Sequence, residues 1–337
     1  MSWLLTGGAG YIGGHVLRAM QDAGLEVVVV DDLSTGDVRR VPAGTPFIVA
    51  SVLDGDTMRR VMIRHGVTGV IHLAAKKSVE ESMEDPLLYY RENVVGGLSL
   101  LEAMGATGVR RLVFSSSAAV YGTPGQDSVD EDAPTRPESP YGRTKLVNEW
   151  MVRDAARALG FSCVSLRYFN VTGSASAVLA DNDGVNLFPR VLRALSRGEQ
   201  PVLFGEDHPT RDGSCLRDYV HVQDLAEAHV AAARLVASGT CDETINIGCG
   251  TGHTVLEVLA AVSEVTGFDA TPHVQGRRPG DPPGVVAEVT KASQVLNWTA
   301  RLGLRDMIGS AWDAMQAGPA ARRVRPRRVL DPVSRAS

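Results

Sequence analysis

The sequence has little lysine, little cysteine and no long apolar run. Lysine supplies only four of the 34 basic residues, at positions 76, 77, 145 and 291. No stretch approaches the roughly 18 apolar residues of a membrane-spanning helix, and the first residues lack the basic segment of an export signal. We therefore expect a cytoplasmic protein without a membrane partner.

Cysteine and histidine show no metal-ligand pattern. The cysteines, Cys163, Cys215, Cys241 and Cys249, are far apart and include no Cys-x-x-Cys pair. Most lie in apolar or glycine-rich surroundings, which favours buried or incidental thiols over disulfides or zinc. The eight histidines form no recognisable ligand set either, so we expect no metal site.

The net charge of −5 is unevenly distributed. Residues 318–337 carry six arginines and one aspartate, so the rest of the chain has a net charge of about −10. An acidic body argues against nucleic acid as a partner. The basic tail is more typical of a solvated, disordered end than of a recognition arm.

The first half of the chain alternates short apolar runs with amphipathic stretches. We expect strands at residues 3–6, 26–31, 46–50, 69–75 and 110–117. Gly24 predicts the end of the first helix, and Asp54 predicts the N-cap of a helix running to His65. This alternation is typical of an α/β protein with a parallel sheet and helices on both of its faces.

Three glycines follow the first expected strand in Gly-x-x-Gly-x-x-Gly spacing: Gly7, Gly10 and Gly13. Glycine permits a tight turn and close backbone approach, and the helix N-terminus offers amides and a positive dipole end to a pyrophosphate. Asp31, which ends the second strand, would bind the adenosine ribose hydroxyls and repel a 2′-phosphate. Asp32 could take that role, or either aspartate could simply cap a loop. The sequence therefore predicts a Rossmann-type doubly wound sheet that binds NAD rather than NADP.

The pattern loosens after Tyr168 and becomes helical again at 222–237, 254–265 and 303–315. We expect residues 1–170 to form the NAD-binding domain, re-entered around 215–250. Residues 171–317 then form mainly a smaller α/β substrate lobe, followed by the basic tail at 318–337.

Tyr141 and Lys145 stand four positions apart at the start of an expected helix. With seven tyrosines and so few lysines, this spacing arises by chance only about 0.08 times. Positions i and i+4 share a helix face, so the Lys145 ammonium can lie beneath the Tyr141 ring edge. A tyrosine base near pH 7 needs its pKa lowered from about 10, at roughly 4 kcal/mol, and a charge about 4 Å away supplies a similar energy. We expect Lys145 to supply most of this effect, with an oxidised nicotinamide adding to it.

Serines end the fifth expected strand, at the carboxyl edge where doubly wound sheets bind ligands. Ser117 could bridge a substrate hydroxyl and the Tyr141 oxygen. A serine held only by the backbone of a turn is the alternative.

The glycine turn, "SSSAAVYG" and "SPYGRTK" together resemble the extended short-chain dehydrogenase/reductase superfamily. The stretches "SLRYFNVTG", "TINIGCGTGHTVLEV" and above all "DHPTRDGSCLRDYVHV" narrow the resemblance to UDP-glucose 4-epimerases (UDP-galactose 4-epimerases), from Trp3 to about Met315. The resemblance implies an isomerase with tightly held NAD. Tyr141 would remove the proton of the sugar 4-hydroxyl while C4 gives hydride to NAD, and the 4-keto sugar would take the hydride back on its other face.

The resemblance also implies the role of each matching position. Catalysis would fall to Tyr141, Lys145 and Ser117. The expected cofactor-binding residues are Gly7, Gly10, Tyr11, Ile12, Gly13, Asp31, Ser51, Val52, Leu73, Ala74, Ala75, Lys77, Asn93, Ser115, Tyr141, Lys145 and Tyr168. The expected substrate-binding residues are Ser117, Tyr141, Asn170, Asn186, Leu187, Arg217, Arg278 and Asp281. Arginines suit a diphosphate entering an acidic body, although Arg217 beside Asp218 could form a structural ion pair instead.

Three features depart from the family pattern. Ser51 stands where an aspartate usually contacts the adenine, and the segment 170–186 is a few residues short. Val285 is intermediate between a bulky tyrosine and the smaller residues that admit an N-acetyl group. The nucleotide, the hexose and the acceptance of N-acetyl sugars therefore stay open.

The same residues bear on three other functions: a dehydratase, a ketoreductase and a non-catalytic NAD sensor. A sugar-nucleotide 4,6-dehydratase needs an acid and a base where Ala118 and Ala119 stand. A ketoreductase acting on a UDP- or dTDP-sugar stays open, and it would consume external cofactor. A non-catalytic NAD sensor is disfavoured because the Tyr141–Lys145 pair is intact. Family analogy predicts a homodimer through helices near 86–104 and 141–158, with a nucleotide sugar as substrate.

Overall fold

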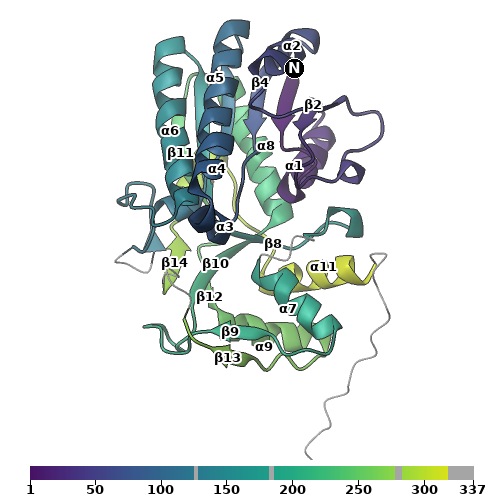
Figure 1. Ribbon diagram of the computed structural model, residues 1–337, viewed down its shortest axis with the longest axis vertical. Helices are drawn as coiled ribbons and strands as arrows, with labels where there is room; N and C mark the ends of the chain where they lie inside the picture. Colours follow the sequence, from purple (N-terminus) through teal and green to yellow (C-terminus); the bar gives the residue numbers. More distant parts are fainter. Residues whose placement is uncertain (125–127, 182–185, 278–282, 318–337) are drawn as a thin grey trace, which may run out of the picture.

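The computed structural model describes residues 1–124, 128–181, 186–277 and 283–317. The expected substrate residues Arg278 and Asp281 and the basic tail lie outside these residues. Figure 1 shows a larger part built on one sheet and a smaller part below it, around α7, α9 and α11.

Within the described residues, seven parallel strands form the large sheet in the order β11-β7-β5-β4-β1-β2-β3. Their bounds are β1 (Ser2–Thr6), β2 (Glu26–Asp31), β3 (Phe47–Val49), β4 (Val67–His72), β5 (Arg111–Ser115), β7 (Ser162–Tyr168) and β11 (Asp242–Ile247). The order reverses at β1, so β1 and β4 flank the switch point of a doubly wound sheet. All five strands expected from the apolar runs are present, and the expected fold class is confirmed.

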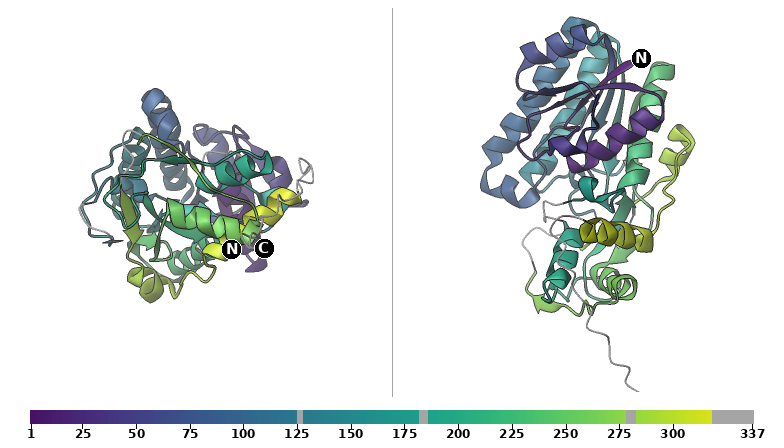
Figure 2. Two further views of the ribbon diagram at one scale, coloured as in Figure 1. Left: turned by 90° about the horizontal axis from the view of Figure 1, so that it is seen from below. Right: turned by 90° about the vertical axis from the view of Figure 1, so that its right-hand side faces the viewer.

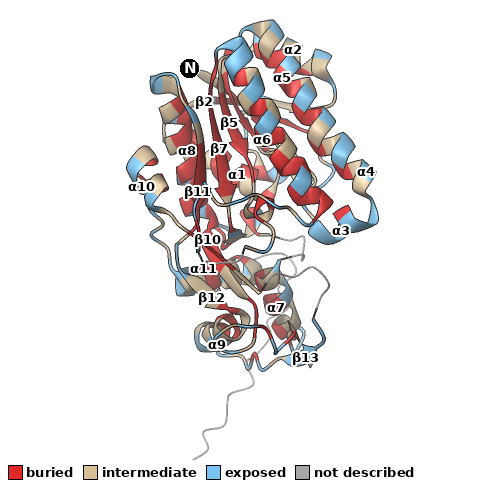
Figure 3. Ribbon diagram, turned by 90° about the vertical axis from the view of Figure 1, so that its left-hand side faces the viewer, coloured by how far each residue is buried: buried red, intermediate tan, exposed pale blue. Residues whose placement is uncertain are grey.

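Helices cover both faces of this sheet (Figures 2 and 3). On one face, α1 (Tyr11–Asp22) and α8 (Val222–Ser238) pack on a core that includes Leu5, Val29 and Leu225. On the other face, α2 (Gly55–Arg64), α5 (Gly96–Thr107) and α6 (Pro140–Leu159) pack on a core that includes Leu4 and Leu100. Because both faces are covered, the central strands are apolar at nearly every position rather than at alternate ones.

Short connecting elements lead toward the carboxyl edge of the sheet. They comprise α3 (Val79–Glu84), α4 (Pro86–Tyr89), the π-helical segment η2 (Tyr90–Val95), and the 3₁₀ turns η1 (Val38–Arg40), η3 (Ala118–Val120) and η4 (Ala177–Leu179). Local chemistry fixes the ends of the helices. The Asp54 carboxylate accepts from the Thr57 amide at 3.0 Å, which confirms the expected cap of α2. Ser139 caps α6 through the Gly142 amide at 3.1 Å, with Pro140 in the first turn.

The smaller part contains a mixed sheet in the order β12-β10-β14-β6, with β8 also paired to β10, and a separate β13-β9 pair. The bounds are β6 (Ser128–Val129), β8 (Asn170–Thr172), β9 (Val202–Phe204), β10 (Leu216–His221), β12 (Gly252–Thr254), β13 (His273–Gln275) and β14 (Gly284–Ala287). Its helices are α7 (Leu187–Ser196), α9 (Val255–Thr266), α10 (Thr290–Leu296) and α11 (Leu304–Gln316). Strand β10 leads directly into α8, so the chain returns to the large sheet before β11.

Candidate active site

A cavity of about 540 Å³ opens at the carboxyl edge of the large sheet. Its walls come from the ends of β1, β2 and β4, the start of α1, and the first turns of α6. The expected cofactor residues that line it are Gly7, Gly10, Tyr11, Ile12, Gly13, Asp31, Ser51, Val52, Leu73, Ala74, Ala75, Lys77, Tyr141, Lys145 and Tyr168. Residues predicted from separate stretches of sequence thus share one cavity.

The glycine turn is packed too closely for any side chain. Gly7 has φ of +75°, and a Cβ there would lie 2.7 Å from the Ala74 amide nitrogen. A Cβ on Gly13 would lie 2.0 Å from the Gly7 carbonyl oxygen. Gly10 is the N-cap of α1 and provides no side-chain cap. The first amides of α1 therefore face the cavity region where an anionic group would be stabilised.

Asp31 is held rigidly at the end of β2. Its carboxylate accepts from the Ala9 amide at 2.9 Å and from the Leu33 amide at 2.8 Å. Burial raises the pKa of Asp31, while these two amide hydrogen bonds lower it. Asp32 is exposed and caps its own turn through the Ser34 amide at 2.9 Å. Both aspartates therefore cap loop backbone, and both also line the cavity.

Tyr141, Lys145 and Ser117 converge beside this cavity. Tyr141 and Lys145 are both buried on α6, and the Lys145 ammonium lies 5.9 Å from the centroid of the Tyr141 ring. The Ser117 side chain hydrogen-bonds the Tyr141 phenol, and its Oγ also accepts from the Ala119 amide at 3.2 Å. The Lys145 ammonium donates to the Ser115 carbonyl at 2.9 Å. Ser117 thus contacts both the Tyr141 phenol and the backbone of its own turn, and its contact with a substrate hydroxyl stays a prediction.

The electrostatics differ from the expectation for Tyr141. Burial raises the pKa of Tyr141, and the hydrogen bond from Ser117 lowers it without cancelling the rise. Burial also lowers the pKa of Lys145 to about 8, although the nearby Glu149 carboxylate opposes this. The expectation that Lys145 supplies most of the lowering, with an oxidised nicotinamide adding to it, is wrong for Lys145, because burial is the largest cause and the net shift is upward. It omitted the cost of placing a phenolate in a dry pocket, and Lys145 is directed at the Ser115 carbonyl.

Two expected cofactor residues stand behind the cavity rather than in its wall. The Ser115 hydroxyl lies 3.1 Å from His229 Nε2 and hydrogen-bonds the Tyr168 phenol. His229 Nδ1 lies 2.9 Å from the Leu225 carbonyl, so Nδ1 carries the proton and Nε2 accepts. Asn93 donates to the Lys76 carbonyl and to Thr144, each at 3.0 Å. Ser115 and Asn93 therefore position residues of the cavity wall.

Besides Ser117 and Tyr141, the expected substrate residues that the structure describes lie on or directly before β8, β10 and α7. Asn170 begins β8 and is exposed. Asn186 caps the start of α7, directly before Leu187, and donates to Asp181 at 2.8 Å. Arg217 lies on β10 in register with Val285 of β14.

Sequence reasoning missed several polar residues in the cavity wall. Ser34, Thr35, Lys76, Ser78, Glu81 and Glu92 all line it. Ser34 and Thr35 follow the end of β2, so their place after a strand at the carboxyl edge was an available signal. Glu81 and Glu92 reach the cavity through the short helices α3 and η2, whose course no local pattern predicts.

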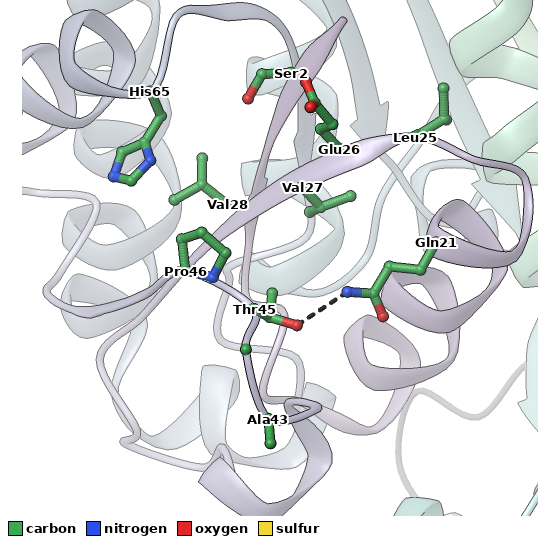
Figure 4. Close-up of a pocket in the computed structure, with 11 residues that line it drawn as sticks. Ser2, Gln21, Leu25, Glu26, Val27, Val28, Ala43, Thr45, Pro46 and His65 are labelled. Carbon is green, nitrogen blue, oxygen red and sulfur yellow. Dashed lines mark hydrogen bonds between the residues drawn. The ribbon is translucent and has the colours of Figure 1, made fainter.

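A second cavity, of about 560 Å³, lies at the opposite edge of the sheet (Figure 4). Ser2 and Glu26, the first residues of β1 and β2, line it, and Gln21 donates to Thr45 across one side at 2.9 Å. Ligands of doubly wound sheets bind at the carboxyl ends of the strands, so this cavity is not the candidate site.

Among the described residues, no group of three or more His, Cys, Asp or Glu side chains could hold a metal ion. No helix in the described ranges is long and apolar enough to cross a membrane.

A glycine turn at a helix N-terminus, an acid ending the second strand and a cluster of Tyr, Ser and Lys side chains define a dinucleotide-dependent enzyme of the short-chain dehydrogenase/reductase type. Residues 3–248 match the family model of the NAD dependent epimerase/dehydratase family, and the chain belongs to this family. The resemblance noted in the sequence is thereby confirmed.

Individual relatives narrow the comparison. The UDP-glucose 4-epimerase of Azospirillum brasilense is 43% identical over 302 residues, which cover 88% of this chain and 87% of the relative. That of Corynebacterium glutamicum is 42% identical over 316 residues, covering 93% and 95%. A solved structure of UDP-glucose-4-epimerase from Stenotrophomonas maltophila, with bound NAD and formylated UDP-arabinopyranose, is 40% identical with a TM-score of 0.89, covering 94% and 98%. The structure from Bifidobacterium longum, in complex with NAD+ and UDP, is 34% identical with a TM-score of 0.89, covering 95% and 100%.

Proposed function

We propose that this protein interconverts the C4 epimers of a nucleotide-activated hexose of the UDP-glucose/UDP-galactose type, using NAD. The observation that carries this proposal is the cluster of buried Tyr141 and Lys145 with half-buried Ser117, beside a cavity lined by the glycine turn. The relatives named UDP-glucose 4-epimerase, which align over nearly the whole chain, support the choice of reaction.

The cavity fits NAD. Gly7 and Gly13 leave no room for a Cβ, so the backbone of the turn stays tight and its amides can approach a pyrophosphate closely. The fixed Asp31 carboxylate can accept from ribose hydroxyls and disfavours a 2′-phosphate. Bound there, NAD supplies a hydride acceptor that returns the hydride later in the same turnover.

The residues of the chain handle the proton and the orientation of the sugar. The Tyr141 oxygen takes the proton of the 4-hydroxyl, and the Ser117 hydroxyl carries it between sugar and phenol. Lys145, anchored on the Ser115 carbonyl, keeps a positive charge near the Tyr141 phenolate, which is the form of the base that accepts the proton, and can donate to the nicotinamide ribose. When the keto sugar turns over, Tyr141 returns the proton to the new 4-hydroxyl.

The nucleotide diphosphate is assigned to the smaller lobe. We place it against Asn170, Asn186, Leu187 and Arg217, together with Arg278 and Asp281 from outside the described residues. We also assign the contact with a sugar substituent to Val285, which is buried and pairs in register with Arg217. Ala118 and Ala119 stand at the start of η3, where a dehydratase needs its acid and base.

A direct assay tests this function. Purified protein incubated with UDP-galactose should yield UDP-glucose without net consumption of NAD or NADH, and Tyr141→Phe should abolish the conversion. Stoichiometric oxidation of added NADH by a UDP- or dTDP-4-keto sugar, without epimerisation, would replace the proposal with a ketoreductase.

The division into lobes follows the same proposal. Residues 1–170, with the returning segment near 215–250, hold NAD, and residues 171–317 mainly hold the nucleotide sugar.

We also place the enzyme in the cytoplasm. All four cysteines lie in the described part of the chain and none is in a disulfide, as is typical of a reducing compartment. Fractionation of cells that produce the tagged protein tests this placement, and recovery from an exported fraction would reject it.

A homodimer is supported by apolar side chains on the helices expected to pair. Leu87 is 78% exposed on α4, Leu98 is exposed on α5, and Trp150 is 54% exposed on α6. These helices pack against one another, so the three side chains offer one apolar surface. Light scattering should report a dimer that Trp150→Glu converts to a monomer. Ile63→Glu, on exposed α2, is the matched control and should leave the dimer intact. A monomeric native protein would reject this surface.

A further inference from the structure

A buried ion pair lies directly behind the catalytic cluster. Glu149 on α6 and Arg167 on β7 are only 2% and 5% exposed. Arg167 binds the carboxylate through two nitrogens, with Nε 2.9 Å from Oε1 and an Nη 2.7 Å from Oε2. Neither residue lines the candidate cofactor cavity. The reaction proposed above does not use either side chain.

Stability alone is a weak reason for such a pair. Removing two charges from water costs several kcal/mol for each ion, and a well-packed apolar pair of similar volume often stabilises as much or more. Arg167 also donates to the Glu131 carbonyl at 3.2 Å, so its guanidinium is held in a fixed direction. The pair is therefore expected to have a role that depends on directional hydrogen bonds, which apolar side chains cannot make.

Glu149 and Arg167 each make a further hydrogen bond to a residue next to the Ser117 turn. The Ser116 hydroxyl donates to Glu149 Oε1 at 2.5 Å. On the other side, an Nη of Arg167 donates to the Tyr121 hydroxyl at 3.0 Å, and the guanidinium lies 5.0 Å from the centroid of the Tyr121 ring. Ser116 and Tyr121 flank the segment that carries Ser117. The two ends of this segment are thus bound to the two halves of one ion pair.

The helix α6 links this arrangement to the base. Tyr141, Lys145 and Glu149 are spaced by four residues, so they lie along one helix face. Both groups are therefore held by α6. The segment that carries Ser117 is bound to Glu149 of this helix, and the Tyr141 phenol belongs to the helix itself. The Tyr121 hydroxyl also donates to Asn246 Oδ1 at 2.7 Å, which extends the contact to β11.

We propose that the Glu149–Arg167 pair is a positioning device that holds residues 116–121 against α6 so that the Ser117 hydroxyl stays on the Tyr141 phenol. This inference rests on the proposed function, because it concerns the hydroxyl that serves the base. Glu149 and Arg167 are positioning residues and touch neither sugar nor cofactor.

We call the ion pair with its bonds to Ser116 and Tyr121 the clamp. The first test removes the Ser116–Glu149 bond or the Arg167–Tyr121 bond, one at a time, and leaves the ion pair intact. Ser116→Ala and Tyr121→Phe, assayed as NAD-loaded enzyme, should each lower kcat about ten-fold, with KM and NAD affinity changed less than about two-fold. Ser162→Ala is the matched control, since it removes a buried hydroxyl bond, 2.6 Å to the Gly239 carbonyl, at the far end of β7. The control should keep kcat within about two-fold of the unmodified enzyme. Unchanged kcat in both clamp variants would overturn the proposal.

The second test replaces the pair itself. Single substitutions leave one buried charge alone and threaten folding, so the double variant Glu149→Leu/Arg167→Met is used. We expect a folded protein with an unfolding midpoint close to that of the native chain and with kcat lowered at least about ten-fold. A double variant that keeps full activity would show that the pair serves packing only.

A spectroscopic readout separates this inference from the choice of substrate. The ionisation of Tyr141 in the NAD-loaded protein is followed as tyrosinate absorbance, with Tyr141→Phe subtracted. Because the Ser117 hydrogen bond lowers the pKa of Tyr141, loss of the clamp should raise that pKa in Ser116→Ala and Tyr121→Phe but not in Ser162→Ala. If no nucleotide sugar is epimerised, the proposed function is wrong. The titration still tests whether the ion pair positions Ser117, because it needs no substrate. An identical Tyr141 titration in all variants would reject the clamp.

Discussion

Substituting Gly13 with alanine should destroy NAD binding while leaving the fold intact. The new Cβ would lie 2.0 Å from the Gly7 carbonyl oxygen and 2.8 Å from the Gly8 Cα, and both obstacles are backbone. An ordinary contact begins at 3.4 Å, so the turn must open by roughly 1.4 Å. Alanine gains about 1 kcal/mol of helix propensity in α1, but this gain does not restore the turn. A displacement of this size should weaken NAD binding about 100-fold, or about 2.8 kcal/mol.

Gly14→Ala is the matched control, one position further along α1. Its Cβ would meet the Leu179 Cδ2, the end of a flexible side chain, at 2.9 Å, and the Arg40 Cβ at 3.2 Å, where a shift of only a few tenths of an ångström is needed. Titration calorimetry of NAD into the two cofactor-stripped variants should show near-native affinity only for Gly14→Ala. Circular dichroism confirms that both are folded. A folded Gly13→Ala protein that binds NAD within about three-fold of native affinity would refute the assignment of this turn.

Three further outcomes are expected. Tyr141→Phe should lower kcat by about 10²- to 10⁴-fold with little change in stability, as judged by steady-state rates and urea unfolding. Burial holds the pKa of Lys145 at about 8 in the folded chain, below its unfolded value, so the cofactor-stripped protein should gain stability as pH rises from about 8 to 10.5. That gain, about 3 kcal/mol, should be absent in Lys145→Met, and a parallel rise in both proteins would contradict it. His229→Leu removes the acceptor of the Ser115 hydroxyl and should cost about 1–3 kcal/mol in urea unfolding, whereas His229→Gln, which retains an acceptor, should cost less. Equal losses in the two variants would show that packing alone matters there.

The sequence was sufficient to predict five of the seven strands described in the large sheet, because the signals of those five are local. Strands buried on both faces are apolar throughout, so short runs such as residues 26–31 stand out without knowledge of their neighbours. The glycine turn and the four-residue spacing of Tyr141 and Lys145 are likewise local, because one turn and one helix suffice to bring their members together.

The rest depends on contacts that no local pattern encodes. Ser115 meets His229 across 114 positions, and Glu149 meets Arg167 across 18, between a helix and a strand. Each residue alone reads as an ordinary polar position. The pKa of Tyr141 is the clearest case, because the spacing of Lys145 was local but the burial that outweighs it is set by the whole fold.

The catalytic edge concentrates buried ionisable groups that a stable fold would otherwise avoid. Tyr141, Lys145 and Glu149 follow one another along a single face of α6, and Arg167 of β7 forms an ion pair with Glu149. The phenol is kept neutral by its dry surroundings, while the ammonium is held one helical turn away by a backbone carbonyl. A base built in this way gains proton affinity from burial and loses it to positive charge brought near, so its strength depends on what occupies the cavity. The fixed arrangement of four side chains around one helix is what allows a small change in nearby charge to decide the protonation of the phenol.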